Sequence, residues 1–145
     1  MSKYHQSTIT ARAGIETDTQ FGAVTPPLHL SSNFSFSGFN QKRRYDYSRS
    51  GNPTRDLLSK TLAELENGVD AVITSSGMAA VTLALQLLQP TDLLIAPHDC
   101  YGGTFRLFSS LAAKGSFKVK FVDQTDSEAF DKAIAEKPKM LWIET

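Results

Sequence analysis

From Asn52 onward, short apolar runs alternate with segments of helical period, and this alternation restricts the fold more than any other feature of the sequence. Asn52 and Pro53 suit the cap and first turn of a helix, and Leu58, Leu62 and Leu65 follow at i, i+4 and i+7. The later segments are predicted, in order, as a strand at 71–74, a helix at 77–88, a strand at 93–97, a helix at 104–114, a strand at 118–122, a helix at 127–136 and a strand at 140–143. This pattern predicts an α/β fold with a mostly parallel sheet, helices on both faces and ligands at the carboxyl ends of the strands.

The first 51 residues show no such period. Gly14, Gly22, the pair Pro26-Pro27 and a serine-rich stretch at 31–37 interrupt any helix or strand. A long arm with little core of its own usually packs against something else, so residues 1–51 are predicted to pack against another domain or another subunit. Residues 52–145 then form the first part of a ligand-binding domain, which we expect to be truncated because Thr145 directly follows a predicted strand.

The composition excludes several classes of function. Lysine and arginine together number 15, as do aspartate and glutamate, so no basic field exists to attract a nucleic acid. The single Cys100 rules out an internal disulfide and fits a reducing compartment, which indicates the cytoplasm. No signal peptide or long apolar segment indicates export or a membrane. His5, His29 and His98 lack metal-ligand spacing, so no metal site is predicted.

The segment from Thr74 to Ala79 runs from a predicted strand into the start of a helix. Free backbone N–H groups gather at a helix start, Gly77 allows close approach, and Ser76 adds a hydroxyl donor. A phosphate group is the natural ligand of such a site. The same pattern also fits a capped helix start that binds nothing.

Two further segments carry polar side chains suited to a ligand. Arg49 can pair with a phosphate or carboxylate and Tyr47 can donate a hydrogen bond, although a solvated loop also fits the pattern. Tyr101 follows the predicted strand at 93–97 and is therefore placed for ligand contact. The consecutive His98, Asp99 and Cys100 cannot line up as a nucleophile relay, because neighbouring side chains diverge.

Two motifs resemble those of the Cys/Met-metabolism enzymes that depend on pyridoxal 5'-phosphate (PLP). The first is Tyr47-Ser48-Arg49-x-Gly51-Asn52-Pro53-Thr54, and the second is Ser76-Gly77-Met78-Ala79. The resemblance runs from about Thr8 to Thr145. It implies the amino-terminal part of the PLP-dependent transferase fold, known as fold type I or the aspartate-aminotransferase-like fold.

The resemblance also implies roles for the residues of both motifs. Ser76, Gly77 and Met78 are expected to hold the PLP phosphate at the helix start. Tyr47 and Arg49 match a tyrosine and an arginine that reach the same phosphate from a neighbouring subunit. The long amino-terminal arm and an assembly into a homotetramer are consistent with that exchange.

Two residues that follow the second motif, Tyr101 and Arg106, are expected to lie at the reaction centre. Tyr101 matches a catalytic tyrosine that stacks on the cofactor ring and helps to move protons. Arg106 lies about one helical turn later and is expected to bind an acidic leaving group of the substrate. Ser50 is a departure, because relatives that use succinylated substrates can carry a second arginine directly after the one matched by Arg49.

The segment at 96–103 and the final Ile143-Glu144-Thr145 are most similar to the bacterial branch that performs γ-replacement. That branch joins an O-acylhomoserine, expected here to be the O-succinyl ester, to cysteine and gives cystathionine for methionine biosynthesis. O-acylhomoserine sulfhydrylase, methionine γ-lyase and cystathionine β-lyase remain alternatives, since they share these motifs.

The family's catalytic lysine and the aspartate facing the pyridine nitrogen have no counterpart in the chain. Lys60, Lys114 and Lys118 fall on predicted helix surfaces or strand flanks. The chain alone is therefore expected to be inactive. A non-catalytic truncated product that joins a full-length subunit, and an unrelated doubly wound nucleotide-binding domain, are the alternatives from other classes.

Overall fold

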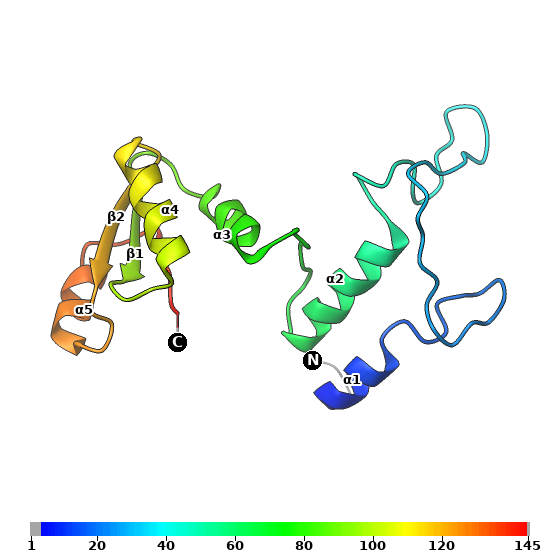
Figure 1. The fold of residues 1–145 in the computed structure, drawn as a ribbon, viewed down its shortest axis with the longest axis horizontal. Helices are drawn as coiled ribbons and strands as arrows, with labels where there is room; N and C mark the ends of the chain where they lie inside the picture. Colours follow the sequence, from blue (N-terminus) through cyan, green and yellow to red (C-terminus); the bar gives the residue numbers. More distant parts are fainter. Residues whose placement is uncertain (1–3, 145) are drawn as a thin grey trace. The chain divides into compact units, whose positions relative to one another are not determined.

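A computed structural model describes residues 4–144 of the chain (Figure 1). The chain divides between Ile73 and Thr74 into two compact units. The elements in chain order are α1 (Gln6–Arg12), α2 (Pro53–Leu65), α3 (Gly77–Leu85), β1 (Leu93–Pro97), α4 (Gly102–Ala113), β2 (Lys118–Val122), α5 (Ser127–Ile134) and β3 (Met140–Leu141).

The first unit contains α1, α2 and the irregular segment between them. Helix α2 begins as the sequence predicts, with Asn52 accepting the N–H of Thr54 at 2.9 Å and Pro53 in the first turn. Gly14 has φ +81°, and a Cβ there would lie 2.6 Å from the side chain of Pro26. Only glycine fits both this backbone conformation and this close approach.

Helix α1 lies where the sequence predicts only irregular structure. It has seven residues, its N-cap is His5, and it buries one apolar side chain, Ile9. A short polar helix with an uncommon cap gives almost no periodic signal. Packing stabilises it instead, since α1 contacts α2 and Gln6 donates to the carbonyl of Leu65 at 3.2 Å.

The second unit contains a three-stranded parallel sheet in the order β2-β1-β3. Strands β1 and β2 have the predicted bounds, with Leu93 opposite Lys118 and Pro97 opposite Val122. Strand β2 pairs with one edge of β1, and β3, which follows later in the chain, pairs with the opposite edge of β1. The strand order therefore reverses at β1, and in such sheets the ligand crevice lies outside the carboxyl ends of the strands at the reversal.

The strand predicted at 71–74 is wrong, because this segment forms no strand among residues 4–144. Its apolar character is real, but Val72 is 75% exposed. Apolar residues form a strand only when another strand accepts their backbone hydrogen bonds. None of the described strands pairs with this segment.

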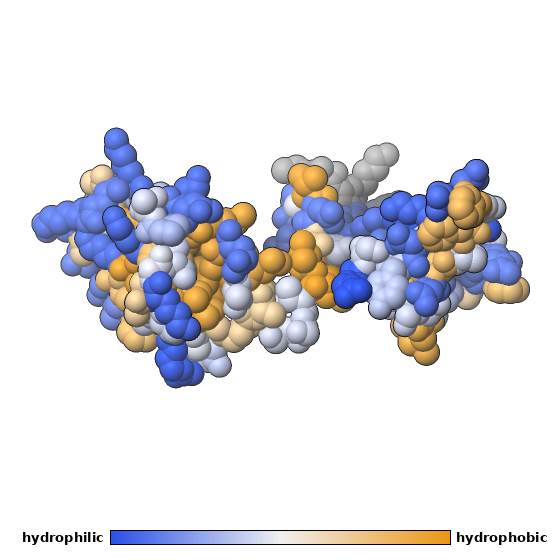
Figure 2. Space-filling view, turned by 90° about the horizontal axis from the view of Figure 1, so that it is seen from above, coloured by the Kyte–Doolittle hydropathy of each residue, from blue (hydrophilic) through white to orange (hydrophobic). Residues whose placement is uncertain are grey.

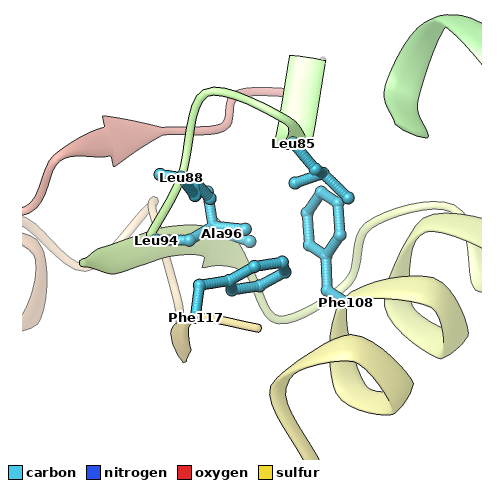
Figure 3. Close-up of a cluster of buried hydrophobic side chains, with 6 residues drawn as sticks. All are labelled: Leu85, Leu88, Leu94, Ala96, Phe108 and Phe117. Carbon is cyan, nitrogen blue, oxygen red and sulfur yellow. The ribbon is translucent and has the colours of Figure 1, made fainter. Parts of the chain in front are cut away.

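Helices cover both faces of the sheet, as predicted. Leu94 and Ala96 point to one face, where they form a cluster with Leu85, Leu88, Phe108 and Phe117 (Figure 3). Ile95 points to the other face and packs with Val122 and with Ala133 of α5. This alternation follows from the two-residue period of a strand.

Exposed apolar side chains are numerous on both units, and Figure 2 shows orange areas on the face in view of each unit. Leu30 is 92% exposed and Phe39 is 94% exposed in the first unit. Leu87 is 71% exposed in the second. Over residues 4–144, none of the helices combines the length and the apolar character needed to cross a membrane.

Candidate functional site

The start of α3 offers backbone donors to an anion. Ser76 is the N-cap, and its hydroxyl oxygen accepts the N–H of Ala79 at 3.2 Å. The first bond of the helix runs from Ala80 N–H to Ser76 O, so the N–H groups of Gly77 and Met78 precede the intrahelical pattern. The first turn carries no acidic residue, and a Cβ added at Gly77 would meet open space. These features fit a phosphate group.

The connection from β1 to α4 brings Tyr101 beside this helix start. Tyr101 is the N-cap of α4, and its side chain is 67% exposed. A Cβ added at Gly103 would lie 2.5 Å from Cε1 of Tyr101 and 3.1 Å from Sδ of Met78. The absence of a Cβ at Gly103 thus makes room for the Tyr101 ring, and the structure brings Tyr101 and Met78 together at this position.

Arg106 lies on the same first turns of α4. Its Nη1 is 3.3 Å from the position that a Cβ at Gly102 would take, and its side chain is exposed. The guanidinium therefore lies along the amino-terminal end of α4, beside Gly102, which directly follows Tyr101. No carboxylate forms a salt bridge with Arg106 within the described part of the chain.

Glu144 is a further residue of this region, and no local sequence pattern indicates a role for it. Its Oε2 accepts the backbone N–H of Tyr101 at 2.6 Å, and its Oε1 accepts Nε1–H of Trp142 at 2.8 Å. The Tyr101 N–H, helped by bonds from Trp142 and Thr104, lowers the pKa of Glu144 although burial opposes the shift. Glu144 is therefore a carboxylate at neutral pH. The next residue, Thr145, which belongs to the predicted motif, lies outside the described residues.

Cys100 has no features of an activated nucleophile. Burial raises the pKa of its thiol, and the charges of Glu144 and Asp99 raise it further. This agrees with the rejection of a relay of His98, Asp99 and Cys100. Among residues 4–144, no three histidine, cysteine or acidic side chains gather in a group able to hold a metal ion.

Tyr47 and Arg49 lie together in the first unit. The Arg49 guanidinium carbon is 5.0 Å from the centre of the Tyr47 ring, which is the geometry of a cation–π contact. Arg55 fixes the backbone beneath them by donating to the carbonyls of Ser48 at 2.9 Å and Arg49 at 3.3 Å. The side chains that could hold a phosphate thus project from a loop that is hydrogen-bonded on its inner side.

Replacing Asn52 should release this loop as well as the start of α2. Besides capping α2, its Nδ2 donates to His29 O at 3.1 Å and to Ser48 Oγ at 3.0 Å. We expect Asn52→Ala to lower the free energy of unfolding by about 2 kcal/mol, and Asn52→Asp, which keeps only the cap, by about 1 kcal/mol. Urea unfolding followed by far-UV circular dichroism measures both changes. Equal losses in the two variants would contradict a role for the amide donors.

Comparisons with known proteins identify relatives of the chain. The family described as Cys/Met metabolism PLP-dependent enzyme matches residues 7–145. A cystathionine gamma-synthase from Escherichia coli is 55% identical over 97% of the chain, and a cystathionine beta-lyase from Coxiella burnetii is 38% identical over 99%. The chain spans 36% and 37% of the lengths of these two relatives.

A solved structure has a matching fold. The cystathionine gamma synthase of Xanthomonas oryzae pv. oryzae, in complex with aminoacrylate and cysteine, matches with a TM-score of 0.95 and 55% identity. The match covers 99% of the chain and 38% of that structure. A second structure of the Xanthomonas enzyme, in complex with cystathionine, also matches with a TM-score of 0.95. The predicted fold class is thus confirmed.

Proposed function

Because the chain belongs to the Cys/Met metabolism PLP-dependent enzyme family, we propose that the protein containing it joins an O-acylhomoserine to cysteine by γ-replacement. The cysteine sulfur forms a bond to the γ-carbon, and the bond from the γ-carbon to the ester oxygen breaks. The thiol proton leaves with the carboxylic acid, and cystathionine is the product. The observation that carries this proposal is the 55% identity to the E. coli synthase, against 38% to the Coxiella β-lyase.

PLP supplies an electron sink for the carbanions of this chemistry. The backbone N–H groups of Gly77 and Met78 and the hydroxyl of Ser76 hold its phosphate. Tyr47 and Arg49 of a neighbouring subunit add a hydroxyl and a bidentate guanidinium to the same phosphate. The exposed side chain of Tyr47 supports this role, as does the lack of a salt bridge to Arg49 among the described residues.

With PLP bound, Tyr101 would offer its aromatic face to the cofactor ring, and its hydroxyl would move a proton when the substrate amine binds. The exposure of its side chain at the reversal of the strand order supports this role. Arg106 binds the acyl group, which is O-succinyl. A free carboxylate on that group would pair with the guanidinium.

The assembly we propose is a homotetramer in the cytoplasm, with residues 1–51 as the arm that contacts the neighbouring subunit and 52–145 as the first part of the PLP-binding domain. The exposed Leu30 and Phe39 of the arm support burial against another subunit. Light scattering of the protein at its natural length is expected to give four times the protomer mass. A monomer that binds PLP would contradict the assembly.

The reaction is tested with the protein at its natural length, which sequencing of the gene beyond the codon for Thr145 defines. O-succinylhomoserine and cysteine are expected to give cystathionine as the main product. Faster turnover with sulfide than with cysteine would indicate a sulfhydrylase. Release of an α-keto acid when no thiol substrate is added would indicate a γ-lyase. Cleavage of cystathionine to homocysteine would indicate a β-lyase.

Arg106 provides a test of the acyl group. Arg106→Ala is expected to raise KM for O-succinylhomoserine roughly 10-fold or more, because it removes the cation that pairs with the free carboxylate. KM for O-acetylhomoserine, which lacks that carboxylate, should change by less than about two-fold. Arg106→Lys is the matched control and should restore part of the preference. Equal effects on both esters would refute the assignment.

A further inference from the structure

Helix α4 begins without a capping side chain of its own. Tyr101 occupies the N-cap position, but its side chain makes no cap hydrogen bond, and the first turn contains no acidic residue. Gly102 and Gly103 follow directly, and glycine restrains the backbone less than any other residue. A contact from outside the helix is therefore needed to fix the direction in which Tyr101 leaves the sheet.

The carboxylate of Glu144 supplies this contact. It accepts the Tyr101 N–H at 2.6 Å across 43 residues of sequence, and the side chain of Thr104 also contributes to the lowered pKa of Glu144. In a capping box, an acidic residue at the third helical position accepts the N–H of the N-cap residue. Here Thr104 holds the third position and Glu144 provides the carboxylate from the end of the neighbouring strand. A charged acceptor at the amino terminus of a helix makes this bond stronger than a neutral one.

Glu144 is itself held by the core. Its other oxygen, Oε1, accepts Nε1–H of Trp142 at 2.8 Å, and the Trp142 ring packs edge-on against Phe108, with ring centres 5.5 Å apart. Thr104 is 2% exposed and is the single buried polar side chain found within residues 4–144. The Glu144 carboxylate thus links the backbone of Tyr101 to the packed core.

We propose that Glu144 is a positioning residue. It fixes the backbone of Tyr101 so that the Tyr101 ring would lie over the ring of bound PLP. Two separate contacts define the position of the Tyr101 ring. Glu144 holds the backbone of Tyr101, and the ring itself lies against Gly103, next to Met78. The inference rests on the proposed function only in taking PLP as the ligand, and it requires no particular ester or thiol.

The test uses the protein at its natural length and compares Glu144→Gln with the wild type. Glutamine keeps the size of the side chain but loses the charge, and its amide nitrogen cannot accept a hydrogen bond. Amide hydrogen exchange over residues 99–104 is expected to become roughly 10- to 100-fold faster, and the PLP dissociation constant to rise about 10-fold. The visible circular dichroism of bound PLP should decrease, because the ring above it is less ordered.

Trp142→Phe tests the support of Glu144. It removes the second hydrogen bond of Glu144 but retains the bond to Tyr101 and an aromatic ring against Phe108, so exchange over residues 99–104 should become faster, but by less than in Glu144→Gln. If Glu144→Gln fails to fold, Glu144→Asp keeps the charge and withdraws it by one methylene group. Its effects should have the same direction and a smaller size.

A double-mutant cycle separates positioning from general stability. In a Tyr101→Ala background, Glu144→Gln should change PLP affinity by less than about two-fold, because the ring it positions is gone. Effects that simply multiply, or unchanged exchange over residues 99–104, would overturn the proposal. A wild type that binds PLP but does not catalyse γ-replacement would refute the proposed reaction alone. A wild type that does not bind PLP would refute both the reaction and the role of Glu144.

Discussion

Replacement of Arg49 by alanine is expected to weaken PLP binding roughly 30- to 1000-fold in the protein at its natural length. A guanidinium that pairs with a phosphate in two hydrogen bonds contributes several kcal/mol when the pair is shielded from water. Within residues 4–144, Arg49 contacts the ring of Tyr47 but no carboxylate, so its charge is available to a ligand. Equilibrium titration of the apo-protein with PLP measures the change.

Pyridoxal, which lacks the phosphate, isolates the effect of the pair. Its affinity should change by less than about two-fold in Arg49→Ala, since no anion is present to bind the guanidinium. Arg49→Lys keeps the charge without the planar fork and should lie between the wild type and the alanine variant. Arg43→Ala removes a cation from the same segment and serves as the control. Unchanged PLP affinity in Arg49→Ala would refute the phosphate role.

Replacement of Phe108 by alanine is expected to lower the free energy of unfolding of the second unit by about 3–5 kcal/mol. Phe108 is fully buried and packs edge-on against Phe117, with ring centres 6.5 Å apart (Figure 3). It also packs edge-on against Trp142, with ring centres 5.5 Å apart. Alanine leaves a cavity between α4, α3 and the sheet, and it removes both aromatic pairs. Urea unfolding followed by Trp142 fluorescence measures the loss.

Two variants calibrate this measurement. Phe108→Leu keeps most of the volume and should cost about 1–2 kcal/mol, because only the ring contacts are lost. Ser110→Ala changes an exposed position of the same helix and should stay within about 0.5 kcal/mol of the wild type. A loss below about 1 kcal/mol in Phe108→Ala would mean that the cluster at Leu94 and Phe108 does not stabilise the unit.

Much of the second unit could be predicted from the sequence, because its elements carry local signals. The strands at Leu93–Pro97 and Lys118–Val122 are apolar runs that directly follow turns, and their predicted bounds agree with the structure. The predicted start of the helix at Gly77 agrees with α3, and in the first unit the cap Asn52 and Pro53 predict the start of α2. The family resemblance based on the motifs at Tyr47 and Ser76 is confirmed by the match over residues 7–145.

The remaining features depend on contacts between distant residues. Helix α1 exists because it packs on α2, and the segment at 71–74 is not a strand because none of the described strands pairs with it. The bond between Glu144 and Tyr101 requires the order β2-β1-β3, which brings the end of β3 next to the end of β1. No local pattern contains that order. The roles of Tyr47, Arg49, Tyr101 and Arg106 stay predictions.

The distance in sequence between Tyr101 and Glu144 has a consequence for synthesis on the ribosome. The two residues are 43 positions apart, so at the usual rate of elongation Glu144 is added roughly 2–9 seconds after Tyr101. Until then α4 can form and pack, but its first turn has no carboxylate to hold it. The start of α4 at Tyr101 is therefore fixed only after β3 and Glu144 have emerged from the ribosome. A nascent chain should bind its cofactor only after that point.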